Sequence, residues 1–172
     1  IAILEQKMIQ NGKGSKLNNS RQPRIFWIML PHAITHEFIL SKGHVAPILY
    51  SALFRAGLMN FNLNSLRKIY SPLEGHPIPN SSLPWIKFAT GSLGQGLSIG
   101  VGVALSAKLQ NRKFRTFVLI GDSETSEGSI WEAFQLAQHY KLNNLCAIID
   151  INGLGQTRKT MLEQNINDYK KR

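Results

Sequence analysis

The sequence is short of cysteine and of long hydrophobic runs, and each shortage excludes a class of protein. A single cysteine, Cys146, stands among 172 residues, which excludes an intramolecular disulfide framework and a zinc site built on a cysteine cluster. That cysteine usage favours a reducing compartment, so we expect a cytoplasmic protein. No apolar run approaches the ~18 residues that a membrane-spanning helix needs, so we expect no membrane association. The chain begins Ile-Ala-Ile-Leu-Glu, with neither an initiator methionine nor the pattern of a signal peptide, which suggests a fragment.

Acidic side chains are also scarce, because 10 Asp and Glu stand against 20 Lys and Arg and give a net charge of +10. A balance this basic brings a nucleic-acid-binding domain into consideration. The excess is greatest over residues 41–115, with nine basic side chains and one acidic one, but it is dispersed rather than gathered in a block. A dispersed positive surface also suits a protein that gathers anionic small molecules such as sugar phosphates. We therefore expect no nucleic-acid partner and keep nucleic-acid binding as the weakest alternative.

The composition, with 43% hydrophobic and 17% charged residues, suits one compact domain with a substantial core. Residues 1–37 carry clusters of turn-forming residues, and their apolar run Ile25–Leu30 is compatible with a strand or with one helical turn. From residue 38 onwards the pattern predicts a helix over Val45–Leu58, a short helix around Leu63–Ile69 and a glycine-rich helix within Gly91–Leu109. A helix so rich in glycine forms only where tight packing needs a close approach of its backbone.

The last third of the chain follows the order strand, loop, helix, strand. Thr116–Ile120 and Leu145–Ile149 are continuous apolar runs, which are typical of strands buried on both faces. Between them, Glu127–Tyr140 has the apolar spacing of an amphipathic helix. A strand–helix–strand unit implies a parallel pair joined by a right-handed crossover. The sequence therefore predicts a three-layer α/β/α fold with a mainly parallel sheet.

Polar residues follow both predicted strands at the edge where an open α/β sheet binds its ligands. Gly121-Asp122-Ser123-Glu124 follows the first strand, and Asp150-Ile151-Asn152-Gly153 follows the second. The carboxylate of Asp122, the amide oxygen of Asn152 and a nearby main-chain carbonyl would form an oxygen-only site for Mg²⁺ or Ca²⁺. The beginning of the next helix, near Glu127, favours a phosphate. Asp and Asn also cap and turn chains after strands, and the spacing alone leaves both interpretations open.

Several motifs in one fixed order resemble the transketolase family, most closely its animal-type members. Gly121-Asp122-Ser123 with Asn152 thirty positions after Asp122 is similar to the thiamine diphosphate motif, which runs Gly-Asp-Gly, roughly thirty residues, Asn. The other matching segments are Leu40-Ser41-Lys42-Gly43-His44, Gly75-His76-Pro77, Thr90-Gly91-Ser92-Leu93-Gly94-Gln95-Gly96-Leu97, Ser126-Glu127-Gly128-Ser129-Ile130-Trp131-Glu132-Ala133 and Asp150-Ile151-Asn152-Gly153-Leu154-Gly155-Gln156. The resemblance covers about residues 38–172 and leaves residues 1–37 as a poorly matched N-terminal segment. It implies an incomplete diphosphate-binding domain.

The resemblance implies a metal site and two catalytic histidines. Asp122 and Asn152 match the family's metal ligands, and the main-chain carbonyl of Leu154 matches the third protein ligand. His44 and His76 match histidines that face the thiazolium and the donor sugar, where they stabilise the oxyanion and move protons.

The resemblance also implies a set of contacts to thiamine diphosphate. Gly91, Ser92 and Leu93 match the loop that lies against the cofactor, and Ser123 takes the place of the second motif glycine. Glu127 matches the glutamate that links the two cofactor sites in the family's dimer. Lys42 has two interpretations, a phosphate contact and a solvated lysine, of which we favour the second. Glu124 and Glu127 are also compatible with simply complementing the positive end of the following helix.

The family reaction transfers a two-carbon ketol unit from a ketose phosphate to an aldose phosphate, and it uses thiamine diphosphate with a divalent metal. We expect the same of this chain with a partner, either a second copy or a complementary C-terminal subunit. The alternative is a truncated, inactive fragment that at most binds the cofactor or other chains. Three departures from the family favour that alternative: Ser123 replaces a glycine, residues 1–37 lack the family's Ser-Gly-His element, and nothing matches the glutamate of the second domain that activates the aminopyrimidine. We therefore expect this chain alone to be inactive.

Overall fold

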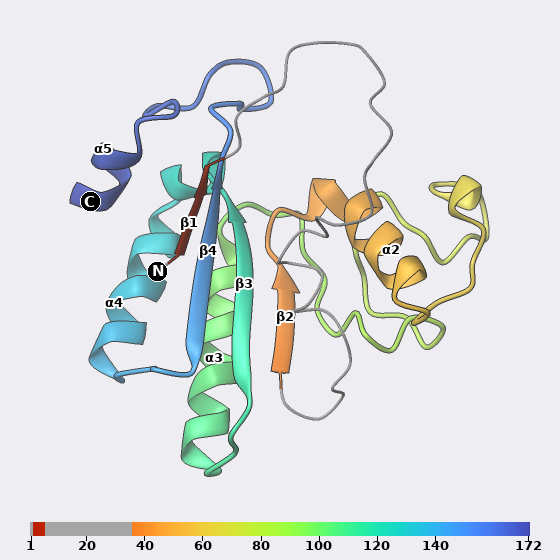
Figure 1. The fold of residues 1–172 in the computed structure, drawn as a ribbon, viewed down its shortest axis with the longest axis horizontal. Coiled ribbons are helices and arrows are strands. Elements are labelled where there is room, and N and C mark those ends of the chain that lie inside the picture. The colour runs from red at the N-terminus through yellow and green to blue at the C-terminus, as the bar shows by residue number, and fades with distance from the viewer. Residues whose placement is uncertain (1, 6–35) are drawn as a thin grey trace, which may run out of the picture.

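The computed structural model describes residues 2–5 and 36–172, and it shows an α/β fold around a four-stranded parallel sheet. The strands are β1 (Ala2–Glu5), β2 (His36–Leu40), β3 (Arg115–Gly121) and β4 (Leu145–Ile151). They lie side by side in the order β1-β4-β3-β2, and every neighbouring pair is parallel (Figure 1). The predicted parallel pair is therefore confirmed as the centre of the sheet, and the apolar run Ile25–Leu30 lies outside the described residues.

Helices pack against the parallel sheet, as the α/β prediction requires. The helices are α2 (Ala46–Arg55), α3 (Gln95–Leu109), α4 (Gly128–His139) and α5 (Ile166–Lys171). Alternate strand residues point to opposite faces. Ile39, Val118 and Ala147 join the core beneath α3 and α4, whereas Leu40 joins the core beneath α2. Figure 1 shows α3 behind β3 and β4, with α2 beside the β2 edge.

The glycine content of α3 is explained by its approach to the sheet. A Cβ atom on Gly100 would overlap Cγ2 of Val118 in β3, so any side chain there would push the helix away from the strand. Leu97, Val101 and Ala104 line the same buried stripe of α3. The glycine-rich helix is thus held by close packing rather than by intrinsic propensity.

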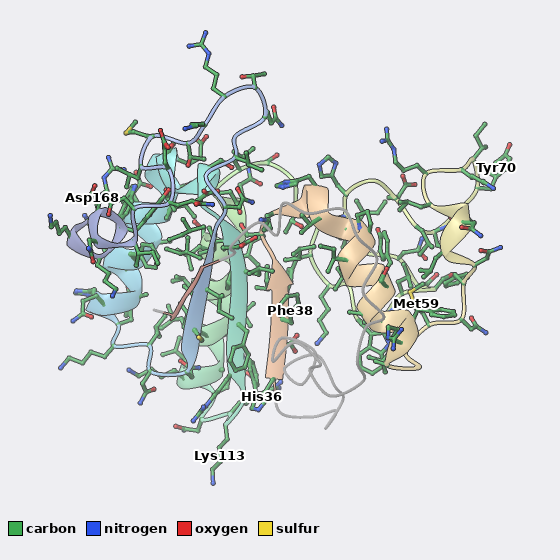
Figure 2. The ribbon with its side chains drawn as sticks, turned by 45° about the horizontal axis from the view of Figure 1, so that its top comes forward. His36, Phe38, Met59, Tyr70, Lys113 and Asp168 are labelled. Atoms are coloured by element: carbon green, nitrogen blue, oxygen red, sulfur yellow. The ribbon has the colours of Figure 1, made fainter. Side chains whose placement is uncertain are left out.

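The prediction of a short helix around Leu63–Ile69 is wrong. The structure has only a single 3₁₀ turn there, η2 (Leu63–Ser65), which the side chain of Asn62 caps by accepting a hydrogen bond from the backbone N–H of Asn64. The following residues do not continue the turn, because Arg67 and Tyr70 have left-handed φ angles of 60° and 65°. Tyr70 lies fully exposed at the tip of this loop, beyond α2 (Figure 2).

A basic turn and the carboxyl ends of the central strands lie at opposite ends of the sheet. The basic turn Arg112–Arg115 joins α3 to the beginning of β3, and Figure 2 shows Lys113 projecting there into solvent. The carboxyl ends of β3 and β4 lie at the opposite end of the sheet. None of the helices formed by the described residues has the length and apolar character needed to cross a membrane.

Candidate functional site

The carboxyl ends of β3 and β4 bring Asp122 and Asn152 to one rim of the sheet. Gly121 pairs with Asp150 at the end of the ladder, and the backbone N–H of Asp122 donates to the carbonyl of Asp150 at 3.1 Å. The loops that follow β3 and β4 therefore begin side by side. The juxtaposition expected from the strand–helix–strand pattern is therefore present in the fold.

The carboxylate of Asp122 is buried and tied to the loop that follows β4. Its side-chain oxygen Oδ2 accepts hydrogen bonds from the backbone N–H groups of Asn152 and Gly153, at 3.2 and 2.7 Å, and from the hydroxyl of Thr160 at 3.2 Å. Oδ1 accepts a single bond, from the backbone N–H of Ser123 at 3.0 Å. The residue is 2% exposed. Asp122 therefore locks together the two loops that form the rim.

The three predicted metal ligands keep acceptor capacity for a cation. A carboxylate offers about four acceptor positions, and Oδ1 of Asp122 uses one of its two. The amide oxygen of Asn152 accepts a bond from the N–H of Leu154 at 2.8 Å, which leaves its second lone pair. Within residues 2–5 and 36–172, no donor reaches the carbonyl oxygen of Leu154. All three ligand atoms are oxygens, which is the type of ligand that Mg²⁺ and Ca²⁺ prefer.

A metal site at this rim would rest on the single carboxylate of Asp122. Among the residues that the structure describes, no group of three or more His, Cys, Asp and Glu side chains could hold a metal ion. The site would therefore depend on neutral oxygen ligands of the protein and on oxygen atoms of the ligand itself.

Ser123 fits the rim without backbone strain. It is the first residue of the 3₁₀ turn η3 (Ser123–Ser126), and the side chain of Asp122 caps that turn. The left-handed φ angles found in the described residues fall elsewhere, so the backbone at this position does not require glycine. Ser123 is half-buried, and it is the residue at which this chain departs from the Gly-Asp-Gly part of the thiamine diphosphate motif.

His44 and His76 line one cleft of about 540 Å³, together with Arg67, Glu74, Gly75 and Ile78. His44 lies in the 3₁₀ turn η1 (Gly43–Val45), directly after β2, and His76 comes from the loop that follows η2. Burial lowers the pKa of His44 below its usual 6.5, and the charge of Lys42 adds to that lowering. A histidine with a lowered pKa is mostly neutral at pH 7, so it can accept a proton.

The loop of residues 90–94 packs between the two histidine segments. Gly91 has a φ of +136°, and a Cβ atom there would lie 2.6 Å from Cδ2 of His76. A Cβ atom on Gly43, beside His44, would lie 2.6 Å from the carbonyl oxygen of Thr90. Gly43 and Gly91 therefore leave no room for a side chain, and the loop lies directly against the ring of His76 and the backbone just before His44.

The remaining predicted contacts lie at the surface around this loop. Ser92 and Leu93 are exposed at its tip. Glu127 is also exposed, and it stands at the N-cap of α4 without a capping hydrogen bond from its side chain. A Cβ atom on Gly94 would lie 2.8 Å from Cβ of Glu127, which places the glutamate beside the loop. The roles assigned to these residues stay predictions.

Sequence reasoning missed two buried charged residues beside the rim. Lys42 was expected in solvent, but it is buried and its ammonium nitrogen lies 2.5 Å from Oδ2 of Asp150. Glu124 was expected to complement a helix end, but it is buried and accepts three hydrogen bonds. The one available signal was position, since each stands within two residues of a predicted site residue, and position alone does not distinguish a buried charge from a solvated one.

Comparisons with known proteins identify the family. The family model described as "Transketolase, thiamine diphosphate binding domain" matches residues 32–172. Human transketolase-like protein 2 is 49% identical over 140 residues, which cover 80% of this chain and 22% of that protein. Human transketolase is 48% identical over 144 residues, which cover 83% of this chain and 22% of that protein. One subunit of the apulose-4-phosphate transketolase of Phocaeicola vulgatus is 42% identical over 136 residues, or 77% of this chain and 48% of that polypeptide.

Solved structures agree with these relatives. A transketolase variant from Pichia stipitis superimposes with a TM-score of 0.64 and 31% identity, covering 79% of this chain and 22% of that one. A complex of Pichia stipitis transketolase with sedoheptulose-7-phosphate gives a TM-score of 0.59 and 33% identity, covering 70% of this chain and 19% of that one. The chain thus spans about a fifth of the length of its first relatives. On the family match and on these identities, the chain belongs to the transketolase family and comprises part of its thiamine diphosphate-binding domain.

Proposed function

We propose that this chain binds thiamine diphosphate with a divalent cation and contributes to the transfer of a two-carbon ketol unit from a ketose phosphate to an aldose phosphate. The observation that carries the proposal is the packing of the 90–94 loop against His76, which with His44 lines one cleft, in a chain whose Asp122 and Asn152 meet at one rim. Family membership supplies the cofactor class, and the sedoheptulose-7-phosphate complex of a Pichia stipitis relative supports sugar phosphates as substrates.

Each part of the site has a task in this proposal. Asp122, Asn152 and the carbonyl of Leu154 would hold Mg²⁺ or Ca²⁺, whose charge offsets that of the diphosphate oxygens. When bound, thiamine diphosphate supplies the nucleophile and electron sink of the reaction. His44, whose pKa is lowered by partial burial and by Lys42, accepts or returns a proton at the sugar hydroxyls, and His76 across the cleft donates hydrogen bonds to developing charge.

We propose further that the chain pairs with a second copy of itself or with a complementary C-terminal subunit, and that turnover needs the complementary C-terminal part. The chain spans 22% of human transketolase, whereas the separately named Phocaeicola vulgatus polypeptide is covered to 48%. The purified chain alone should therefore show no steady ketol transfer. Sustained transfer from xylulose 5-phosphate to ribose 5-phosphate without any added protein contradicts this part of the proposal.

Cofactor binding is tested by thermal unfolding of the chain with Mg²⁺ alone and with Mg²⁺ plus thiamine diphosphate. A ligand at a hundredfold excess over its Kd stabilises the folded state by about 2.7 kcal/mol, which raises Tm by several degrees. Asn152→Ala should abolish the rise. The matched control is Asn143→Ala, which makes the same change at an exposed residue just before β4, and it should keep the rise. An equal rise in the Asn152 variant, or none in the unaltered chain, contradicts the proposal.

A further inference from the structure

Glu124 is a buried carboxylate at the rim that the proposed reaction does not use. It lies in η3, two residues after Asp122, and is 1% exposed. Its Oε1 accepts hydrogen bonds from the hydroxyl of Ser41 at 2.6 Å and from the backbone N–H of Gly94 at 3.0 Å. Its Oε2 accepts a bond from the backbone N–H of Gly121 at 2.7 Å. Both oxygens are therefore engaged, and every bond is made inside the protein.

The three partners of Glu124 come from three different segments of the candidate site. Ser41 follows β2 and precedes the turn that carries His44. Gly94 ends the 90–94 loop and caps α3. Gly121 ends β3, next to the rim. One carboxylate thus fixes the positions of these segments relative to one another, although they are far apart in the sequence.

The contacts continue from Gly94 to the histidines. The carbonyl of Gly94 accepts a hydrogen bond from the hydroxyl of Ser129 in α4 at 3.2 Å, so both backbone polar groups of this residue are held. At the other end of the loop, Gly91 lies against the ring of His76. Gly91 and Gly94 are only three residues apart, and the backbone at Gly91 has no free space beside His76. A shift of Gly94 should therefore also displace the ring of His76.

We infer that Glu124 is a positioning residue that holds the 90–94 loop, and through it the imidazole of His76, in register with the Asp122 rim. The relevance of this coupling to catalysis rests on the proposed function. The coupling between Glu124 and His76 can itself be measured in the chain without ligands. A carboxylate is suited to this task because three donors converge on it and it carries no hydrogen of its own. A neutral amide of the same shape places an N–H₂ group against at least one of those donors.

Glu124→Gln tests the coupling by NMR of the histidine rings in the ligand-free chain. The imidazole signals of His76 and the amide signal of Gly94 should both move, although His76 does not touch Glu124. The matched control is Leu142→Ala, which removes a buried core side chain just before β4 and lowers stability without touching the loop. It should leave the His76 signals in place. Unmoved His76 signals in Glu124→Gln, or equal movement in both variants, overturn the inference.

Calorimetry with thiamine diphosphate in excess Mg²⁺ gives the second readout. Glu124→Gln should weaken cofactor binding at least tenfold, whereas Leu142→Ala should change it less than threefold. If the unaltered chain binds no cofactor, the proposed function fails, and the NMR comparison still decides the inference. If Glu124→Gln does not fold, Ser41→Ala removes one of the three bonds to the carboxylate, and it should move the Gly94 amide signal and the His76 ring signals. Unmoved His76 signals in Ser41→Ala then overturn the inference.

Discussion

The ammonium nitrogen of Lys42 lies 2.5 Å from a carboxylate oxygen of Asp150, and the two residues are separated by 108 positions in the chain. The Lys42 side chain is 3% exposed and that of Asp150 is 13% exposed. The pair spans β3, because Lys42 follows β2 and Asp150 lies at the end of β4. The second oxygen of Asp150, Oδ1, is buried and has no hydrogen-bond partner among the described residues. This carboxylate therefore depends on Lys42 alone among the side chains described.

Breaking this ion pair should be costly. Lys42→Met leaves the charge of Asp150 buried and unpaired, and such changes lower the free energy of unfolding by about 3–5 kcal/mol. Urea unfolding measures the loss. The double variant Lys42→Met, Asp150→Leu replaces both charges by apolar groups and should recover most of it. A single variant within about 1 kcal/mol of the unaltered chain would show that the pair is not closed in solution.

The pKa of His44 should lie below 6.5, because burial disfavours the charged ring and Lys42 repels it. An NMR titration of the ring measures it. The unfolded chain then binds a proton more readily than the folded one, so this residue's contribution to stability falls as the pH drops from 6.5 towards the folded pKa. Lys42→Met should raise the His44 midpoint, since it removes a positive charge. A midpoint at or above 6.5 in the unaltered chain contradicts the expected lowering of this pKa.

The hydroxyl of Thr160 should support metal binding through Asp122. It donates to Oδ2 of Asp122 at 3.2 Å and is buried. Thr160→Val keeps the shape of the side chain and removes the donor, so we expect Mg²⁺–thiamine diphosphate to bind on the order of tenfold more weakly. Thr160→Ser keeps the hydroxyl and should stay close to the unaltered affinity. Calorimetry compares the two, and equal losses would show that packing rather than the hydrogen bond is responsible.

A methyl group at Gly91 should displace His76. The backbone angle at Gly91 is strained for an L-residue and the added carbon would meet the imidazole, so Gly91→Ala should lower the free energy of unfolding by about 1–3 kcal/mol. Gly102→Ala is the matched control, because an added Cβ atom there has no neighbour within 4 Å. In the middle of α3 that change should stabilise the chain by about 0.5–1 kcal/mol. Loss of stability in both variants would point to a general effect of added side chains.

Ser123→Gly should not improve cofactor binding. The backbone at Ser123 needs no glycine, and its N–H already donates to Asp122. We expect thiamine diphosphate affinity to change less than threefold, with a stability loss of about 0.5 kcal/mol from the added backbone freedom. A large gain in affinity, measured by calorimetry, would show that the serine side chain obstructs the diphosphate.

The central unit of the fold was predictable because its strands are continuous apolar runs. β3 and β4 are buried between neighbouring strands and helices, and such burial leaves a clear pattern in the sequence. β2 begins with exposed His36 at the margin of the sheet and was not predicted, and neither was the four-residue β1. Short strands at sheet margins carry too few apolar residues to be distinguished from loops.

The site residues whose positions follow from the order of strands and helices along the chain could be predicted. Those whose burial depends on tertiary contacts could not. Asp122 and Asn152 follow paired strands, so their meeting at the rim follows from the strand–helix–strand order. Lys42 and Glu124 are polar residues whose burial depends on partners far along the chain, at Asp150 and Ser41. No local pattern distinguishes such residues from solvated ones, because only the tertiary fold supplies the compensating charge or donors.

The strand order β1-β4-β3-β2 also has a consequence for how the sheet assembles. The rim lies between β3 and β4, which one helix joins along the chain, so this pair closes a short loop and costs little chain entropy. β1 precedes the other described strands, yet its partner is β4, so it can add to the sheet only after β4 has been made. The β3–β4 pair at the rim can thus assemble early, while β1, the first of the described strands along the chain, has to wait for β4.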